Sequence, residues 1–331
     1  MIFLQPSVDQ VGLVQPAVKN ICKTFNPTLY ILFIMLNENR YLKIYEGQCY
    51  KKKYQKRYQK IIVFDLDETM GSFGDLYILW SGLQKIYNFD KENVQSKFNS
   101  IMDLYPEFLR YGFLQILEFL YTKKKQGDCD KIFIYTNNIC TPPWVSLIIE
   151  YIHTKLNTLD PLFDKIISAF KINNKIIEVS RTKREKSCSD LIRCTMLPKN
   201  TEICFIDDTY HKDMLHEKVF YIQPYPYYHG VSVETIIQRF QNSKCGIEII
   251  ENSNMVGKFY EYIKDWFYFH NPVNFENNAN LQNEINVFVA KKMMYHIKEF
   301  FYLTNRKNRT RKRYSRFSKT TRKNYAFVKN E

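Results

Sequence analysis

The segment Ile61-Ile-Val-Phe-Asp-Leu-Asp-Glu-Thr69 carries the strongest pattern in the chain. Its first four residues form a short apolar, β-branched run, which is typical of a strand buried on both faces. Asp65 and Asp67 follow directly, so two carboxylates stand where this strand ends. We therefore expect a buried strand with acidic residues at its carboxyl end.

Strands and helices alternate on the C-terminal side of this segment. Apolar runs predict further strands at 131–135, 166–170, 202–206 and 219–222, and apolar residues at helical spacing predict helices at 108–121, 144–156 and 191–196. Ser187 and Asp190 have the spacing of a helix N-cap. This alternation predicts an α/β fold, namely a Rossmann-like parallel sheet flanked by helices, with right-handed crossovers.

Polar residues follow three of the predicted strands. Asp65 and Asp67 follow the first, Thr136-Asn137-Asn138 the second, and Asp207-Asp208 the strand at 202–206. In sheets of this kind, ligands bind beyond the carboxyl ends of the strands. These three clusters should therefore converge at one edge of the sheet.

The clustered carboxylates suit the hydrolysis of a phosphate ester. Asp65 is placed to attack phosphorus, and Asp67 could protonate the leaving oxygen and later take a proton from water. Mg²⁺ prefers hard oxygen ligands, so we expect it to bind Asp65, the backbone carbonyl of Asp67, and Asp208. Asp207 is expected to orient a lysine rather than to bind the metal.

The phosphoryl group also needs neutral donors and a fixed positive charge. Thr136 and Asn137 are the expected donors. Lys183 and Lys186 both precede the helix predicted near 191, and Lys186 is preferred because it directly abuts the capped N-terminus, where backbone donors also favour anions.

Taken together, the Asp65-Leu-Asp-Glu-Thr69 segment, Thr136, the lysine and Ile-Asp207-Asp208 resemble the four motifs of the haloacid dehalogenase superfamily. The Asp-Leu-Asp-Glu-Thr form resembles the branch of RNA polymerase II carboxy-terminal domain phosphatases and NLI-interacting-factor-like proteins. The resemblance spans residues 60 to 240 and implies a Mg²⁺-dependent phosphatase of phosphoserine or phosphothreonine in a protein. Two alternatives remain open: a polynucleotide phosphatase on the same fold, and a non-enzymatic adaptor that uses the fold for docking.

Charge and composition suggest partners and location. The net charge of +14 is concentrated in Lys51–Lys60, with six basic residues in ten, and in Arg306–Lys323, with ten in eighteen. Such runs favour nucleic acid or acidic proteins, although a solvated tail is an equal alternative. Eight cysteines without a CxxC pair, and no apolar run near the roughly 20 residues of a membrane span, favour an intracellular protein of the nucleus or cytoplasm. The bias toward Lys, Asn, Ile and Tyr fits an A/T-rich genome, such as that of a large DNA virus.

Four segments are expected along the chain. Residues 1–55 form an N-terminal extension, 56–245 the catalytic domain with a small cap insertion, 246–303 a helical, aromatic-rich extension, and 304–331 a basic tail. The intervals between the motifs are too short for a large separate lid, so an open site is expected.

Overall fold

A computed structural model describes residues 38–51, 59–140, 143–198, 201–270 and 283–303. The chain divides into two compact units, residues 1–40 and 41–331. Of the first unit, the structure describes only the start of α2 (Glu38–Tyr41). All features below belong to the second unit. The predicted basic tail and much of the predicted N-terminal extension lie outside the described residues.

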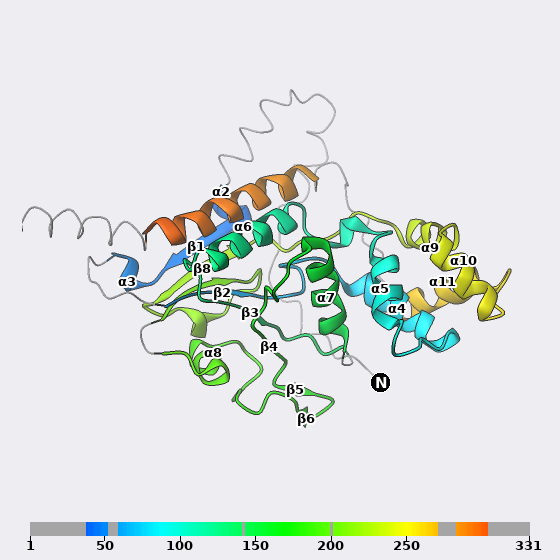
Figure 1. Ribbon diagram of the computed structural model, residues 1–331, viewed down its shortest axis with the longest axis horizontal. Coiled ribbons are helices and arrows are strands. Elements are labelled where there is room, and N and C mark those ends of the chain that lie inside the picture. The colour runs from blue at the N-terminus through cyan, green and yellow to red at the C-terminus, as the bar shows by residue number, and fades with distance from the viewer. Residues whose placement is uncertain (1–37, 52–58, 141–142, 199–200, 271–282, 304–331) are drawn as a thin grey trace, which may run out of the picture. The chain divides into compact units, whose positions relative to one another are not determined.

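A six-stranded sheet forms the centre of this unit (Figure 1). The strand order is β1-β8-β7-β2-β3-β4, and every neighbouring pair is parallel except β1 with β8. The bounds are β1 (Leu42–Glu46), β2 (Gln59–Phe64), β3 (Lys131–Tyr135), β4 (Lys165–Ile167), β7 (Thr201–Ile206) and β8 (Val219–Pro224). The chain is therefore α/β with a mostly parallel sheet flanked by helices, compatible with a Rossmann-like fold.

The register places the ends of the three central strands side by side. Phe64 of β2 is paired with Ile134 of β3 and with Ile206 of β7. The next residues along these strands, Asp65 and Asp207 among them, therefore emerge at the same edge.

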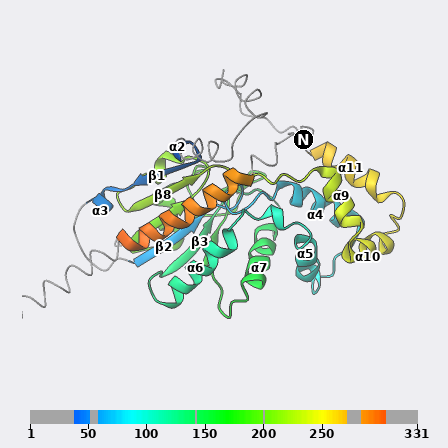
Figure 2. The same cartoon turned by 90° about the horizontal axis from the view of Figure 1, so that it is seen from above.

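Helices cover both faces of the sheet because its central strands are apolar on both faces. On one face, Ile61 and Val63 pack in a core with Leu191 of α8 (Cys188–Thr195). Their neighbour Phe64 faces the opposite side, where its ring contacts Phe113 of α6 (Phe113–Lys125). A helix at 283–303 covers this second face beside α6, as Figure 2 shows, and Phe300 of that helix packs on β8.

Five helices form a helical unit at one end of the sheet (Figure 1). They are α4 (Gly74–Ile86) and α5 (Val94–Met102), which follow β2, and α9 (Val233–Gln241), α10 (Lys244–Asn252) and α11 (Phe259–His270), which follow β8. α11 packs on α4 and α9, and α10 packs on α5 and α9. Gly82 permits the close approach of α4 to α11, since a Cβ there would lie 2.9 Å from Ile263 Cδ1. Helices α10 and α11 of the predicted extension thus form one body with α4, α5 and α9.

One predicted boundary differs at the start of the domain predicted at 56–245. β1 lies inside the predicted extension 1–55, where Leu42 is buried and the strand pairs antiparallel with β8 along its whole length. The sheet is consequently not purely parallel. Residues 283–303 belong to the same compact unit as the sheet, because Phe300 and Ile297 are fully buried.

Several elements differ from their predicted bounds for local reasons. The helix predicted at 108–121 begins at Phe113, because η1 (Pro106–Phe108) precedes it and Gly112 has a φ of 69°. The strand predicted at 166–170 ends at Ile167, and a hairpin of β5 (Lys171–Ile172) and β6 (Lys175–Ile176) follows through two asparagines with positive φ. Such a pair is typical of a two-residue turn.

The helices predicted at 144–156 and 191–196 are α7 (Trp144–Leu156) and α8, and Ser187 caps α8 as predicted by accepting a hydrogen bond from the Asp190 N–H. The remaining elements are α3 (Gln48–Lys51), between β1 and β2, and η2 (Lys212–Met214), between β7 and β8. Within the described residues, no helix is both long and apolar enough to cross a membrane.

Candidate active site

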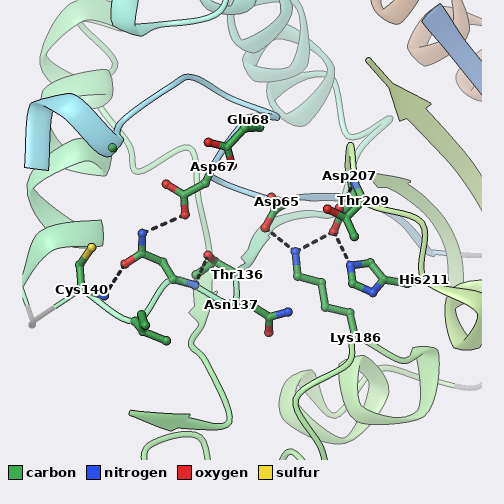
Figure 3. Close-up of a pocket in the computed structure, with 13 residues that line it drawn as sticks. Asp65, Asp67, Glu68, Thr136, Asn137, Cys140, Lys186, Asp207, Thr209 and His211 are labelled. Carbon is green, nitrogen blue, oxygen red and sulfur yellow. Dashed lines mark hydrogen bonds and ion pairs between the residues drawn. The ribbon is translucent and has the colours of Figure 1, made fainter. Parts of the chain in front are cut away.

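The predicted polar clusters open into one pocket at the carboxyl ends of β2, β3 and β7 (Figure 3). Its volume is about 390 Å³. The lining includes Asp65, Asp67, Glu68, Gly74, Thr136, Asn137, Asn138, Ile139, Cys140, Lys186, Asp207, Thr209 and His211. Residues up to 146 positions apart in the sequence, from Asp65 to His211, are thus brought together by the parallel strand order.

Lys186 lies at the centre of this pocket and contacts two carboxylates. Its Nζ lies 2.6 Å from Asp207 Oδ2 and also donates to Asp65 Oδ1. Only 2% of the Lys186 side chain is exposed. Burial works against a charged lysine, but Asp207 and Asp65 outweigh it and raise the pKa of Lys186. The same ammonium outweighs burial at Asp207 and, with His211, holds the pKa of that carboxyl below its usual value. The pocket therefore contains a fixed cation.

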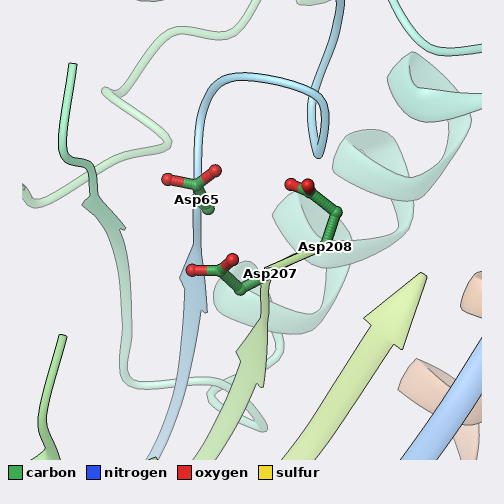
Figure 4. A group of neighbouring side chains, drawn as sticks. All are labelled: Asp65, Asp207 and Asp208. Atoms are coloured by element: carbon green, nitrogen blue, oxygen red, sulfur yellow. The ribbon is translucent and has the colours of Figure 1, made fainter. Parts of the chain in front are cut away.

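Three carboxylates could hold a metal ion. Oxygen atoms of Asp65, Asp207 and Asp208 lie within 4.8 Å of one another (Figure 4). Oxygens that share one octahedral Mg²⁺ lie about 3 to 4 Å apart, so small adjustments would suffice. Burial, and then the neighbouring charge of Asp207, raise the pKa of Asp208, and a divalent cation would relieve that repulsion. The donor set therefore fits a hard cation such as Mg²⁺.

The hydrogen bonds of Asp207 differ from those of Asp65 and Asp208. Asp207 is occupied at both oxygens, by Lys186 at Oδ2 and by the Thr209 N–H at Oδ1. Asp65 and Asp208 each use only Oδ1, which leaves both Oδ2 atoms without a hydrogen-bond partner among the described residues. This pattern favours Asp65 and Asp208 as metal ligands and Asp207 as the residue that orients Lys186.

Thr69 and Gly71 shape the loop that carries the first motif. The Thr69 hydroxyl donates to Asp208 Oδ1 at 2.7 Å and accepts from the Asp208 N–H at 2.9 Å, so it clamps the end of β7 to the loop after β2. Gly71 lets this loop fold back, since a Cβ there would lie 2.4 Å from the Phe108 carbonyl oxygen. Glu68 adopts a φ of 55° in the turn.

A buried arginine, Arg110, holds the backbone of this turn through hydrogen bonds. Arg110 donates from Nε to the Thr69 carbonyl at 2.6 Å and from Nη2 to the carbonyls of Glu68 and Tyr225. Only 2% of Arg110 is exposed. Burial, and then the charges of Asp67 and Asp208, raise the pKa of Glu68 to about 8. The turn is thus surrounded by several charged side chains that are largely shielded from solvent.

Asp67 and Thr136 are connected through Asn138. Asn138 Nδ2 donates to Asp67 Oδ2 at 2.8 Å, and the Asn138 backbone N–H donates to Thr136 Oγ1 at 2.9 Å. Burial raises the pKa of Asp67 above its usual value, and the bond from Asn138 opposes that rise. Asp67 is therefore held in a defined position at the pocket wall.

Arg181 joins the loop after β3 to the loop before α8. Its guanidinium donates to the carbonyls of Thr136 at 3.1 Å and Arg184, and to Asn137 Oδ1 at 2.8 Å. The side chain is 2% exposed and lies over the Tyr135 ring. Because Asn137 Oδ1 accepts from Arg181, its amide N–H groups remain available to the pocket.

The structure distinguishes between the two lysines that the sequence left open. Lys183 forms an exposed ion pair with Asp213 and does not line the pocket, whereas Lys186 does. Lys186 is therefore the lysine of this site.

Sequence reasoning missed several residues that shape the site, namely Glu68, Thr69, Arg110, Asn138, Arg181 and His211. Thr69 and Asn138 lie inside the quoted motifs, so their positions offered a signal. The sequence contains no signal for Arg110 and Arg181, since a single arginine in a basic chain is usually interpreted as a solvent-exposed residue. His211 also lines the pocket, with Nε2 3.3 Å from Asp207 Oδ2.

Comparison of the chain with models of protein families, with curated proteins and with solved structures finds no match. The function must therefore be argued from the residues of the site.

Proposed function

We propose that this chain is a Mg²⁺-dependent phosphatase that forms an acyl phosphate on Asp65. One observation carries the proposal: a buried lysine between Asp65 and Asp207 lies in the same pocket as Thr136 and Asp67, and the clamped Asp208 lies beside Asp65 and Asp207. Phosphoryl transfer needs a positioned nucleophile, a proton donor and compensation of the phosphate charge, and each has a candidate in this pocket.

In the first half of the reaction, an Asp65 oxygen attacks phosphorus and the bond from phosphorus to the leaving oxygen breaks. Asp67 gives its proton to that oxygen, so the product leaves as a neutral alcohol. Lys186, the Thr136 hydroxyl and the Asn137 amide hold the phosphoryl oxygens. Water then attacks the phosphorus of the phosphoryl-aspartate, Asp67 takes a proton from it, and Asp65 is regenerated as phosphate leaves.

Bound Mg²⁺, held by Asp65, Asp208 and the Asp67 carbonyl, would supply neutralisation of the charge on the phosphoryl oxygens. The chain's own contribution is to keep these ligands in place. Thr69 fixes Asp208, and Arg110 fixes the carbonyls of the turn that follows Asp67.

The substrate we propose is phosphoserine or phosphothreonine in a protein, such as the carboxy-terminal repeat of RNA polymerase II. Two features support it: the Asp65-Leu-Asp-Glu-Thr69 form of the first motif, and a proton donor suited to an alcohol leaving group.

The test is phosphate release from p-nitrophenyl phosphate, a phosphoserine peptide and a 3′-phosphorylated oligonucleotide, with Mg²⁺ or EDTA, by wild type and Asp65→Asn. We expect Mg²⁺-dependent release from the first two substrates, abolished by the substitution. Release from the oligonucleotide alone, weakened by salt, would indicate a polynucleotide phosphatase. Folded wild-type protein without turnover on any substrate would favour the non-enzymatic adaptor.

A further inference from the structure

Asn138 makes three hydrogen bonds at the wall of the pocket. Its side-chain Nδ2 donates to Asp67 Oδ2 at 2.8 Å, its Oδ1 accepts from the Cys140 N–H at 2.9 Å, and its backbone N–H donates to Thr136 Oγ1 at 2.9 Å. The Asp67–Asn138–Thr136 network thus spans two strand ends.

The orientation of the Asn138 amide is fixed by its neighbours. A backbone N–H can only donate, so the Asn138 oxygen must face Cys140, and the NH₂ group must face Asp67. Reversing the amide would place two donors against each other at Cys140. Asp67 Oδ2 is therefore always an acceptor, and a proton carried by Asp67 must reside on Oδ1.

The backbone bond has a parallel effect on Thr136. A hydroxyl offers one proton and two lone pairs. Because Thr136 Oγ1 accepts from the Asn138 N–H, its own proton is available to a phosphoryl oxygen. The Thr136 backbone N–H is already used by the Ile167 carbonyl, so the hydroxyl is the donor that this residue can offer.

We propose that the Asn138 side chain is a positioning residue that fixes which oxygen of Asp67 delivers the proton to the leaving group. The inference rests on the proposed function, in which the Asp65–phosphorus bond forms as the bond to the leaving oxygen breaks. The Oδ1 proton of Asp67 moves to that oxygen, while Oδ2 keeps its bond to Asn138. Asn138 itself exchanges no proton.

If Asn138 positions Asp67, the effect of its loss should depend on the leaving group, which a purely structural role would not predict. An aliphatic alkoxide is a far poorer leaving group than a phenolate, whose parent acid has a pKa of about 10 in tyrosine and lower when a nitro group is attached. Loss of proton donation should therefore slow the release of an alcohol much more than the release of p-nitrophenol.

The experiment compares kcat/KM for a phosphoserine peptide and for p-nitrophenyl phosphate in wild type and Asn138→Ala. This ratio covers only the steps up to departure of the leaving group, so later hydrolysis of the phosphoryl-aspartate does not affect it. Alanine keeps the backbone N–H that binds Thr136 and removes the two side-chain bonds, to Asp67 and from the Cys140 N–H. We expect a loss of about 30-fold on the peptide and less than about 3-fold on the aryl phosphate.

Three further variants make the result specific. In an Asp67→Asn background, Asn138→Ala should cause no additional loss on the peptide, because the residue it positions no longer carries a proton. Asn88→Ala, at an exposed asparagine outside the pocket lining, should match wild type on both substrates. Asn138→Leu keeps the side-chain size without the donor and replaces the alanine variant if thermal melts show that alanine does not fold.

Equal losses on the two substrates, or losses that add to those of Asp67→Asn, would overturn the inference while leaving the proposed function intact. Wild-type protein without turnover on either substrate would reject both.

Discussion

Lys186 Nζ lies 2.6 Å from Asp207 Oδ2, and both side chains are almost completely buried. The second oxygen of Asp207 accepts from the Thr209 N–H, so this carboxylate has both oxygens occupied. The Lys186–Asp207 ion pair shows that the adjacent residues Asp207 and Asp208 have different roles, which the sequence alone does not distinguish. Asp207 holds the cation, and Asp208 remains available to a metal.

The two adjacent aspartates should therefore respond differently to amide substitution. Asp208→Asn should raise the Mg²⁺ concentration for half-maximal activity by tenfold or more. Asp207→Asn should change that concentration little, but should lower the free energy of unfolding by about 3 kcal/mol because it leaves a buried lysine partly uncompensated. Mg²⁺ titrations and urea unfolding measure the two effects. A larger metal effect from Asp207→Asn would reassign the ligand.

Lys186 and Lys183 provide a matched pair of substitutions. Lys186→Met removes the cation inside the pocket and should lower kcat/KM by about 1,000-fold. Lys183→Met removes one partner of an exposed ion pair with Asp213 and should stay within twofold of wild type. Steady-state kinetics on an aryl phosphate with Mg²⁺ would check both. Comparable losses from the two variants would show that the pocket was wrongly assigned.

Arg181 should be essential to the geometry of the loop after β3 and the loop before α8. Arg181→Met leaves the carbonyls of Thr136 and Arg184 without their donor, and we expect a loss of about 3 kcal/mol in the free energy of unfolding. Arg181→Lys keeps the charge but cannot reproduce the fork of donors, so KM for the phosphate ester should still rise. Denaturant unfolding and KM measurements check these outcomes, and a fully active lysine variant would contradict them.

Asp164 gives a pH-dependent prediction away from the pocket. Burial works against its ionised form, but hydrogen bonds from Lys124, the Ile132 N–H and Lys131 outweigh it and hold its pKa below the usual value. Its ionised form therefore stabilises the fold above about pH 4, and this contribution is lost as the pH falls through the folded-state pKa.

Asp164→Asn should accordingly cost about 1 kcal/mol in the free energy of unfolding at pH 7 and progressively less toward pH 2. Asp160→Asn, in an exposed pair with Lys125, is the control and should leave the unfolding midpoint unchanged. Urea unfolding at a series of pH values compares the variants. A cost that does not diminish in acid would refute the electrostatic explanation.

Local patterns were sufficient to predict most of the sheet. The predicted strand at 131–135 coincides with β3 and the helix at 144–156 with α7, because continuous apolar runs and helical spacing leave few alternatives. β1 was missed although Leu42 and Ile44 alternate with polar residues, since five residues beside a basic run carry a weak signal. Its antiparallel pairing depends on β8, whose paired residues lie 174 to 182 positions away.

The site residues that belong to sequence motifs could be predicted, whereas those whose position depends on tertiary contacts could not. Asp65, Asp67, Thr136, Lys186 and Asp208 all stand beside predicted strand ends or a helix cap. Arg110 and Arg181 act through backbone carbonyls, and nothing in the sequence shows which carbonyls a distant arginine will reach. Helices α4, α5 and α9 were not predicted, and the packing of α4 and α5 with α9–α11 depends on tertiary contacts that the sequence does not show.

Trapping the covalent intermediate tests the central claim most directly. In Asp67→Asn, an aryl phosphate can still transfer its phosphoryl group, whereas hydrolysis lacks its base, so the phosphoryl-enzyme should accumulate. Borohydride reduction followed by peptide mass spectrometry should then find homoserine at position 65 with Mg²⁺ present, and none with EDTA or in Asp65→Asn. Wild-type turnover without any label at position 65, or with the label on another residue, would contradict the assignment of Asp65 as the nucleophile.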